Sequence, residues 1–374
     1  MKPVPERYPA LDVLRGMTVA FMIVVNTPGS WNAIYAPFKH SDWHGFTVTD
    51  LVFPSFLFVV GNALSFSMRK MKSLFHTAFM GKVFKRTAII FVIGILLGVF
   101  PFVRVEAGHY RWKDLADTRI WGVLQRIAVC YCIAAFMIRY SSQRMLVIMS
   151  VLILLLYWYV LYYFGTQPGP YSLEGNAVGR LDALYLSPRN MYRHYGFPFD
   201  PLGLLSTFPA VINVVAGFLT GSFIQENGKR MSGIVKLLVA GILLVAAGAL
   251  WDRWLPINKP LWTSSYVVYA TGFDLLILAA LIIIIDVWSF RKWTYFFEVF
   301  GKNPLFIYIV AWVVIVLLGM IRINGGSVRG IIYRDAFTSW LSDKNASLLF
   351  AVFYMLLMWL VGYVMDRRKI YVKV

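Results

Sequence analysis

The sequence predicts an all-α fold, a polytopic bundle of membrane-spanning helices. Hydrophobic residues make up 59% of the chain and charged residues only 14%, whereas soluble domains carry about 25% charged residues. The mean hydropathy is +0.66. Apolar runs of the length that a helix needs to cross the hydrocarbon core, about 20 residues, recur along the whole chain.

Ten apolar segments are long enough, some of them narrowly, to cross a bilayer as helices. Because they follow one another without a separate polar domain, we expect residues 1–374 to form a single transmembrane domain. An even number of spans places both termini on the same side. The predicted spans are 11–27, 48–67, 87–103, 119–138, 145–164, 203–224, 233–250, 263–286, 296–319 and 346–365.

The distribution of Lys and Arg predicts the orientation. The net charge of +18 comes from short basic clusters between the apolar runs, which indicates topology rather than a nucleic-acid partner. The clusters at 69–72, 82–86 and 367–369 are dense, close to helix ends and nearly free of acids. Positive charge stays on the cytoplasmic side, so we expect both termini to be cytoplasmic.

In this orientation the long loops lie outside. Loops of this length are usually functional or disordered, and their aromatic and Arg content argues against disorder. Trp rings beside polar groups suit the recognition of a sugar, although an interfacial aromatic belt gives the same pattern. These loops lie near 28–47, 104–118, 165–202, 251–262 and 320–345.

The first outside loop holds the leading candidate for a general base, His40. A neutral imidazole, with an unperturbed pKa of about 6.5, takes a proton near neutral pH. If the loop turns back toward the bilayer, Asn26 and Asp50 at the adjoining helix ends lie near it. Asn26 then donates to an oxyanion, and Asp50 fixes the imidazole tautomer. The alternatives are a structural histidine and an Asp50 that only caps the second helix.

His44 follows His40 by four residues and shares a helical face with it if this piece is helical. Two histidines with Asp42 between them also suit zinc, but no third ligand stands at a fixed spacing. We therefore expect no metal.

Polar residues inside the predicted spans form a second set. They serve either as bonds between helices or as the lining of a polar cavity for a charged ligand. The sequence matches no P-loop or G-x-S-x-G motif, which disfavours ATP-driven transport and serine hydrolysis. The set comprises Asp12, Arg15, Gln125, Arg126, Asn213, Asp274, Lys302 and Asn303.

Several motifs, in order along nearly the whole chain, resemble the heparan-α-glucosaminide N-acetyltransferase family of transmembrane acyltransferases, and the chain looks like a bacterial member. The motifs are L-D-V-L-R-G-M (11–17), V-V-N-T-P-G (24–29), K-H-S-D-W-H-G-F-T-V-T-D-L-V-F-P-S-F-L-F-V-V-G (39–61), G-V-L-Q-R-I (122–127), D-P-L-G-L-L-S-T-F-P-A (200–210), P-I-N-K-P-L-W-T-S-S-Y-V (256–267) and G-K-N-P-L-F-I-Y (301–308).

The resemblance implies that acetyl moves from cytosolic acetyl-CoA to the amino group of a terminal glucosamine across the membrane. The catalytic histidine of the family's K-H-x-x-W motif falls on His40, its partner asparagine on Asn26 and the motif aspartate on Asp50. The family's first-helix arginine falls on Arg15, and a basic residue upstream falls on Arg7. It also implies a homodimer.

These inferences combine into one hypothesis: a multi-pass acetyltransferase of the bacterial inner membrane, with the His40 loop on the periplasmic side and direct transfer favoured over an acetyl-histidine route. The alternatives are a proton- or ion-coupled amino-sugar transporter and a membrane scaffold. The expected donor-binding residues are Arg7, Arg15, Arg126 and Lys302, and the expected acceptor-binding residues are Trp43, His44, Asn258, Lys259 and Trp262.

Overall fold

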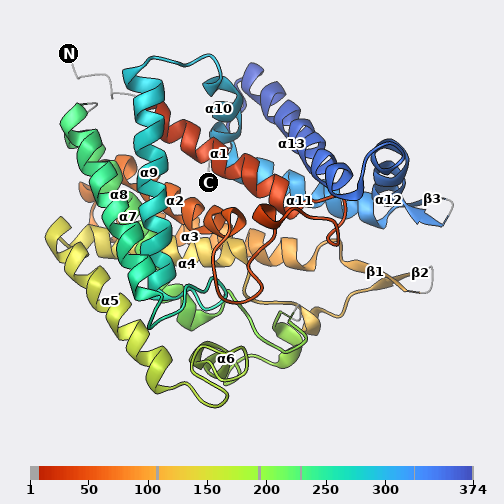
Figure 1. Cartoon of the computed structure of the whole chain (residues 1–374), viewed down its shortest axis with the longest axis horizontal. Helices are drawn as coiled ribbons and strands as arrows, with labels where there is room; N and C mark the ends of the chain where they lie inside the picture. Colours follow the sequence, from red (N-terminus) through yellow and green to blue (C-terminus); the bar gives the residue numbers. More distant parts are fainter. Residues whose placement is uncertain (1–7, 107–108, 193–194, 228–229, 324, 373–374) are drawn as a thin grey trace.

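The chain forms a bundle of long helices that cross one another at several angles (Figure 1). The computed structural model describes residues 8–106, 109–192, 195–227, 230–323 and 325–372. The helices of nine or more residues are α1 Pro9–Asn26, α2 Val48–Lys72, α3 His76–Val99, α4 Val123–Tyr140, α5 Gln143–Tyr163, α7 Leu204–Asn227, α8 Met231–Trp251, α9 Ser264–Ile282, α10 Thr294–Lys302, α11 Pro304–Met320 and α13 Asp343–Arg367.

Each of the ten predicted spans overlaps one or more of these helices. Across the described residues, eight helices are long and apolar enough to cross a membrane, and the bent pair of α10 and α11 makes nine. The third predicted span, α3, is not among them and carries Lys82, Lys85 and Arg86 in its first half. The predicted all-α, multi-pass architecture is confirmed.

The ninth predicted span, 296–319, is not one continuous helix. α10 and α11 meet at Asn303 with a bend of 84°. Pro304 explains the break, because proline lacks the N–H that would continue a helix and disfavours helical geometry in the residue before it. Asn303 accordingly has φ −132° and ψ 49°.

The loops between the spans contain short elements of their own. Two antiparallel hairpins stand at one edge of the bundle (Figure 1). The short elements are β1 Val103–Glu106, β2 His109–Trp112, β3 Arg322–Ile323, β4 Gly326–Ser327, the helices α6 Ala177–Asp182 and α12 Val328–Tyr333, the 3-10 turns η1 Ala36–Phe38, η2 Leu115–Asp117 and η3 Pro188–Asn190, and the π-helical turns η4 Ile283–Val287 and η5 Arg334–Thr338.

α2 and α7 form the centre of the bundle. In α7, 72% of the most apolar stretch is buried, against 22% in the peripheral α5. The two central helices approach closely because glycines face each other's backbone. A methyl group on Gly61 would lie 1.9 Å from the carbonyl oxygen of Val214, and one on Gly217 would lie 1.9 Å from that of Phe58. This contact fixes α2, the helix that begins at the candidate site.

The α1–α2 loop (27–47) lies against two other loops, those of 164–203 and 252–263. The N–H of Gly45 donates to the carbonyl of Ile257 at 2.8 Å. The indole N–H of Trp43 donates to the carbonyl of Tyr171 at 2.7 Å. The loop is thus held between segments that are far apart in the sequence.

The central helix contact gives a stability prediction. We expect Gly217→Ala to destabilise the protein by about 1–3 kcal/mol, because its methyl group meets the Phe58 carbonyl and overpacks the interface. Thermal unfolding of the detergent-solubilised protein measures the change. Gly319→Ala in α11 is the matched control: its methyl group meets nothing within 4 Å, and alanine favours helix by about 1 kcal/mol. Equal destabilisation by both variants would refute the packing account.

Candidate active site

Asp50 lies in the first turn of α2, and its side chain is only 1% exposed. One carboxylate oxygen, Oδ2, accepts hydrogen bonds from the N–H groups of Ser41 and Thr47, both at 3.1 Å, and from the Thr47 hydroxyl at 3.0 Å. A negative charge is favourable at a helix N-terminus. The capping role that the sequence left as an alternative is therefore present, and it also closes the loop from Ser41 to Thr47.

The other oxygen of the same carboxylate meets His40. Nδ1 of His40 lies 2.7 Å from Oδ1 of Asp50, and the imidazole is 49% exposed. An ionised carboxylate only accepts hydrogen bonds, so this contact assigns a proton to Nδ1 and leaves the lone pair of the neutral ring on Nε2. A half-exposed imidazole held in this tautomer can act as a general base.

Lys259 enters the same cluster from the loop before α9. Its Nζ lies 3.1 Å from Nδ1 of His40 and 3.4 Å from Oδ1 of Asp50, and its side chain is 19% exposed. Burial lowers the pKa of the Lys259 ammonium, and the carboxylate of Asp50 opposes this shift. The structure thus brings together His40, Asp50 and Lys259, three of the residues selected from the sequence.

Asn258 holds the His40 loop to the loop that carries Lys259. This fully buried side chain donates to the carbonyl of Trp43 at 2.9 Å and lies 3.2 Å from Nδ1 of His44. Burial lowers the pKa of His44, and the carboxylate of Asp252 opposes it. No group of three or more His, Cys, Asp or Glu side chains in the described residues is arranged to hold a metal ion, so the zinc alternative gains no support.

Trp43 is half-buried among aromatic rings. It packs edge-on against Tyr195 and Phe199, with ring centroids 5.6 and 5.5 Å apart. Aromatic rings of this kind suit contact with the apolar face of a sugar ring. Neither Tyr195 nor Phe199 was selected from the sequence, because their position depends on how the 164–203 loop folds back.

Trp262 and Arg126 are both buried and lie close to each other. Trp262 is 1% exposed, and its indole donates to Oδ1 of Asn213 at 3.1 Å. The guanidinium of Arg126 stands 5.0 Å from the centre of the Trp262 ring and also donates to the Ser206 hydroxyl and, at 3.1 Å, to the Gly203 carbonyl. These contacts place Arg126 in the group around Trp262, beside the His40 end of the bundle.

Arg15 and Lys302 meet at another part of the molecule. Arg15 pairs with Asp12, and Lys302 contacts both carboxylate oxygens of Asp366 at 2.9 and 2.8 Å. The end of α10 abuts α1 here, since a methyl group on Gly301 would lie 3.6 Å from Nε of Arg15. The structure therefore separates Arg126 from these two cations.

Two further predicted residues lie on or before α1. Asn26 is its last residue, is exposed, and donates one amide N–H to the carbonyl of Met22 at 2.8 Å. Arg7 lies outside the described residues.

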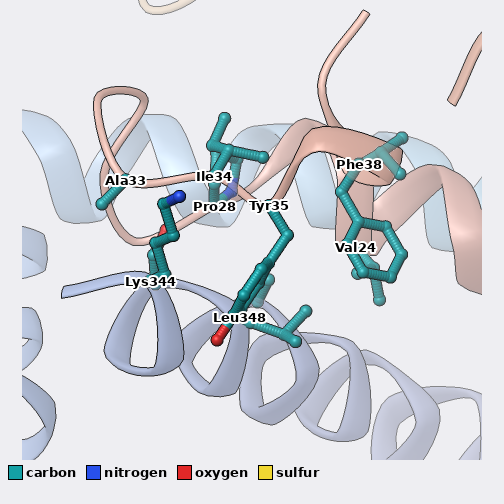
Figure 2. Close-up of a pocket in the computed structure, with 11 residues that line it drawn as sticks. Val24, Pro28, Ala33, Ile34, Tyr35, Phe38, Lys344 and Leu348 are labelled. Carbon is teal, nitrogen blue, oxygen red and sulfur yellow. The ribbon is translucent and has the colours of Figure 1, made fainter. Parts of the chain in front are cut away.

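The segment between Asn26 and His40 packs against α13 around a small pocket (Figure 2). In Figure 2, Tyr35 from the loop extends toward Leu348 of α13, and Phe38 lies beside Val24 of α1. The cavity there is about 20 Å³, enough for about one water molecule. This cavity is too small for a sugar. The side chains around it pack the loop against α13.

A larger hollow opens near β1 and the end of α3. Its volume of about 290 Å³ suits a monosaccharide-sized ligand. Its wall includes Arg119, which binds the buried carboxylate of Asp200 through two hydrogen bonds of 2.8 and 2.6 Å. The sequence did not indicate this pair, because the two residues lie on different loops. The lining comprises Gly98, Val99, Arg104, Lys113, Asp114, Asp117, Thr118 and Arg119.

This chain is similar to two curated proteins that share one name. Heparan-alpha-glucosaminide N-acetyltransferase of mouse is 27% identical over 359 residues, which cover 81% of this chain and 53% of the mouse protein. The human enzyme of the same name is 28% identical over 362 residues, covering 83% of this chain and 53% of the human protein. The chain thus spans about half the length of these curated relatives.

The model of the family described as heparan-alpha-glucosaminide N-acetyltransferase, catalytic, matches residues 7–250. The matched range includes Asn26, His40 and Asp50, whereas Lys259 follows its end. Because the match covers well over half of the chain, the protein belongs to the heparan-alpha-glucosaminide N-acetyltransferase family.

Proposed function

We propose that this protein is a membrane-embedded N-acetyltransferase that moves acetyl from cytoplasmic acetyl-CoA to the amino group of a glucosamine-type sugar on the outer side. The main support is the half-exposed imidazole of His40, bonded at 2.7 Å to the buried carboxylate of Asp50, inside the region that matches the family. The names of the relatives supply the reaction class. The protein acts in a bacterial inner membrane as a homodimer.

His40 acts as the general base. Nε2 takes a proton from the sugar amine as the amine nitrogen attacks the thioester carbonyl carbon. The C–S bond then breaks, and the imidazolium returns its proton to the departing CoA thiolate. Asp50 holds the ring in the tautomer that leaves the lone pair on Nε2. Asn26 has a second amide N–H besides the one that bonds Met22, and this N–H is assigned to the oxyanion.

The charged end of the donor binds at the opposite end of α1. Arg15 and Lys302 lie at the junction of α1 and α10, and Arg7 precedes the same helix in the sequence. Guanidinium and ammonium groups bind phosphate oxygens through charge-assisted hydrogen bonds. Arg126 has a different role in this proposal, because its contacts are with Trp262 and Ser206.

The acceptor approaches from the loop side. Trp43 and His44 follow His40 in the sequence, and their rings pack edge-on with centroids 6.2 Å apart. Asn258 and Trp262 are buried and hold the surrounding loops in place. We favour direct transfer within a ternary complex. An acetyl-histidine intermediate is the alternative route, and trapping labelled acetyl on His40 without acceptor would support it.

One observation favours the second candidate, an amino-sugar transporter. Transporters of several folds carry discontinuous helices in corresponding positions of two repeats, and α10 and α11 form one such broken span. A second broken span is absent from the described residues by the same criterion, so the transferase remains the stronger proposal.

The base assignment gives the first activity test. We expect His40→Gln to lower kcat for transfer from labelled acetyl-CoA to glucosamine by about 100- to 10,000-fold, the range that general-base catalysis contributes. Glutamine keeps an amide N–H for Asp50, so the fold is expected to survive, and thermal unfolding checks this. His109→Gln, on the exposed strand β2, is the matched control. Equal rates for His40→Gln and wild type would rule out His40 as the base.

The donor site gives a binding test. Acetyl-CoA at about 100 times its dissociation constant should stabilise the purified protein by about 2.7 kcal/mol through mass action. Acetyl-pantetheine, which lacks the nucleotide, should stabilise it less. Arg15→Gln should reduce the effect of acetyl-CoA and leave that of acetyl-pantetheine unchanged, whereas Arg322→Gln on the exposed strand β3 should change neither. No stabilisation by acetyl-CoA at any concentration would move the transporter to first place.

A further inference from the structure

Lys259 stands where its charge acts on the proposed base. Its Nζ lies 3.1 Å from Nδ1 of His40 and 3.4 Å from Oδ1 of Asp50. The backbone of Lys259 is fixed, because its carbonyl accepts the N–H of Trp262 at 3.0 Å and the neighbouring Asn258 is bonded to the His40 loop. The ammonium therefore occupies a defined position, although it comes from a loop distant in sequence.

The three groups constrain one another's protons. Nδ1 of His40 donates to Asp50 at 2.7 Å, and an ammonium has only donors, so Lys259 directs its hydrogens to Asp50. Oδ1 of this carboxylate is thus shared between the imidazole and the ammonium. In the usual His–Asp pair the carboxylate stabilises the imidazolium. Here Lys259 also interacts with this carboxylate, so less of its negative charge stabilises the imidazolium. The Lys259 ammonium is in addition a positive charge that repels the imidazolium.

Other titratable groups of the described residues belong to the same loops as this cluster. In the loop, Lys39 and Asp42 pair with each other at 2.9 Å and are both exposed. His44 lies on the same loop, and Tyr195 on the 164–203 loop interacts electrostatically with Asp50. Burial raises the pKa of Tyr195, so this hydroxyl stays neutral and adds no charge.

We propose that Lys259 is a positioning residue whose ammonium keeps the imidazole of His40 neutral in acidic surroundings. The consequence is that the imidazole stays unprotonated, and can act as a base, at a pH where a His–Asp pair alone is protonated. A destabilised imidazolium also returns its proton readily to the CoA thiolate. The role in catalysis rests on the proposed acetyl transfer, whereas the effect on protonation does not.

The test is the pH dependence of carbethoxylation of His40 by diethyl pyrocarbonate, which reacts with neutral imidazole. The purified full-length chain, Lys259→Met and Lys259→Arg are treated across pH 4–8, and mass-spectrometric fragment ions separate His40 from His44. A like charge within a few ångströms shifts a titration by about one to three pH units. For Lys259→Met, we expect the pH midpoint of His40 carbethoxylation to lie at least about one pH unit above that of wild type. For Lys259→Arg, we expect this midpoint to stay near that of wild type. Equal midpoints for wild type and Lys259→Met would overturn the proposal.

The same variants separate this role from acceptor binding, the role expected from the sequence. In acetyl transfer, we expect the acidic limb of the pH profile of kcat/KM for Lys259→Met to shift to higher pH by about one unit. This shift corresponds to about a tenfold loss of kcat/KM at low pH. We expect KM for the amino sugar to be unchanged. A raised KM with an unmoved limb would assign Lys259 to the acceptor instead. If wild type transfers no acetyl while the carbethoxylation midpoint shifts, the proposed reaction fails and the electrostatic coupling stands.

Discussion

The buried carboxylate of Asp50 is the constraint on which the site depends. A carboxylate that is 1% exposed must be surrounded by donors, because an unpaired buried charge is very costly. Its donors come from the α1–α2 loop, including the N-cap residue Thr47, and from the loop before α9. Satisfying one charge therefore folds the His40 loop over the N-terminus of α2 and draws Lys259 to the same point. The capping of α2, the closure of the loop and the orientation of the His40 imidazole all follow from the contacts of this one carboxylate.

Asp50 can hold these partners only if α2 is itself fixed. Close contact through Gly61 and Gly217 sets its position against α7. On the other side, the hydroxyl of Tyr266 in α9 donates to the backbone carbonyl of Asp50 at 2.7 Å. Further along, Ser55 of α2 bonds to Asp274 of α9. Polar contacts of this kind join helices within a membrane, where apolar surface alone gives little preference for one helix partner over another.

Much of this architecture follows from local pattern. Long apolar segments predict helices wherever the chain must cross a membrane, because every backbone group needs an internal partner there. The juxtaposition of His40 and Asp50 was also predictable, since only the short stretch 41–47 separates His40 from the start of α2. What the sequence left open was the arrangement of distant segments. Lys259 was expected to bind the acceptor, with no link to Asp50, and Arg126 was grouped with Arg15 and Lys302. The sequence does not show that α4 begins beside the α9 loop whereas α10 ends beside α1.

The break at Asn303 shows a different limit of predicting membrane spans from the sequence. The Asn-Pro pair is visible in the sequence, and a proline often marks a helix boundary. Hydropathy nevertheless continues across it, so a prediction from apolar length joins α10 and α11 into one span. In the structure the amide of Asn303 bonds to the segment after α13, accepting from the N–H of Val372 at 2.8 Å and donating to the carbonyl of Ile370 at 3.0 Å. These tertiary bonds, which local pattern cannot reveal, satisfy the polar side chain at the break.

The two ends of α1 define what kind of donor suits the proposed reaction. Asn26 follows Arg15 by eleven positions on this helix, and a rise of 1.5 Å per residue makes the separation about 16 Å. That is roughly half of a hydrocarbon core about 30 Å thick. A small transported sugar would need its polar contacts gathered at one depth, yet Arg15 and Asn26 lie about eleven residues apart along α1. Acetyl-CoA joins a charged nucleotide to a thioester through a long flexible arm, and such a molecule can touch both ends at once. The separation of the groups therefore favours an elongated acyl donor over a compact cargo.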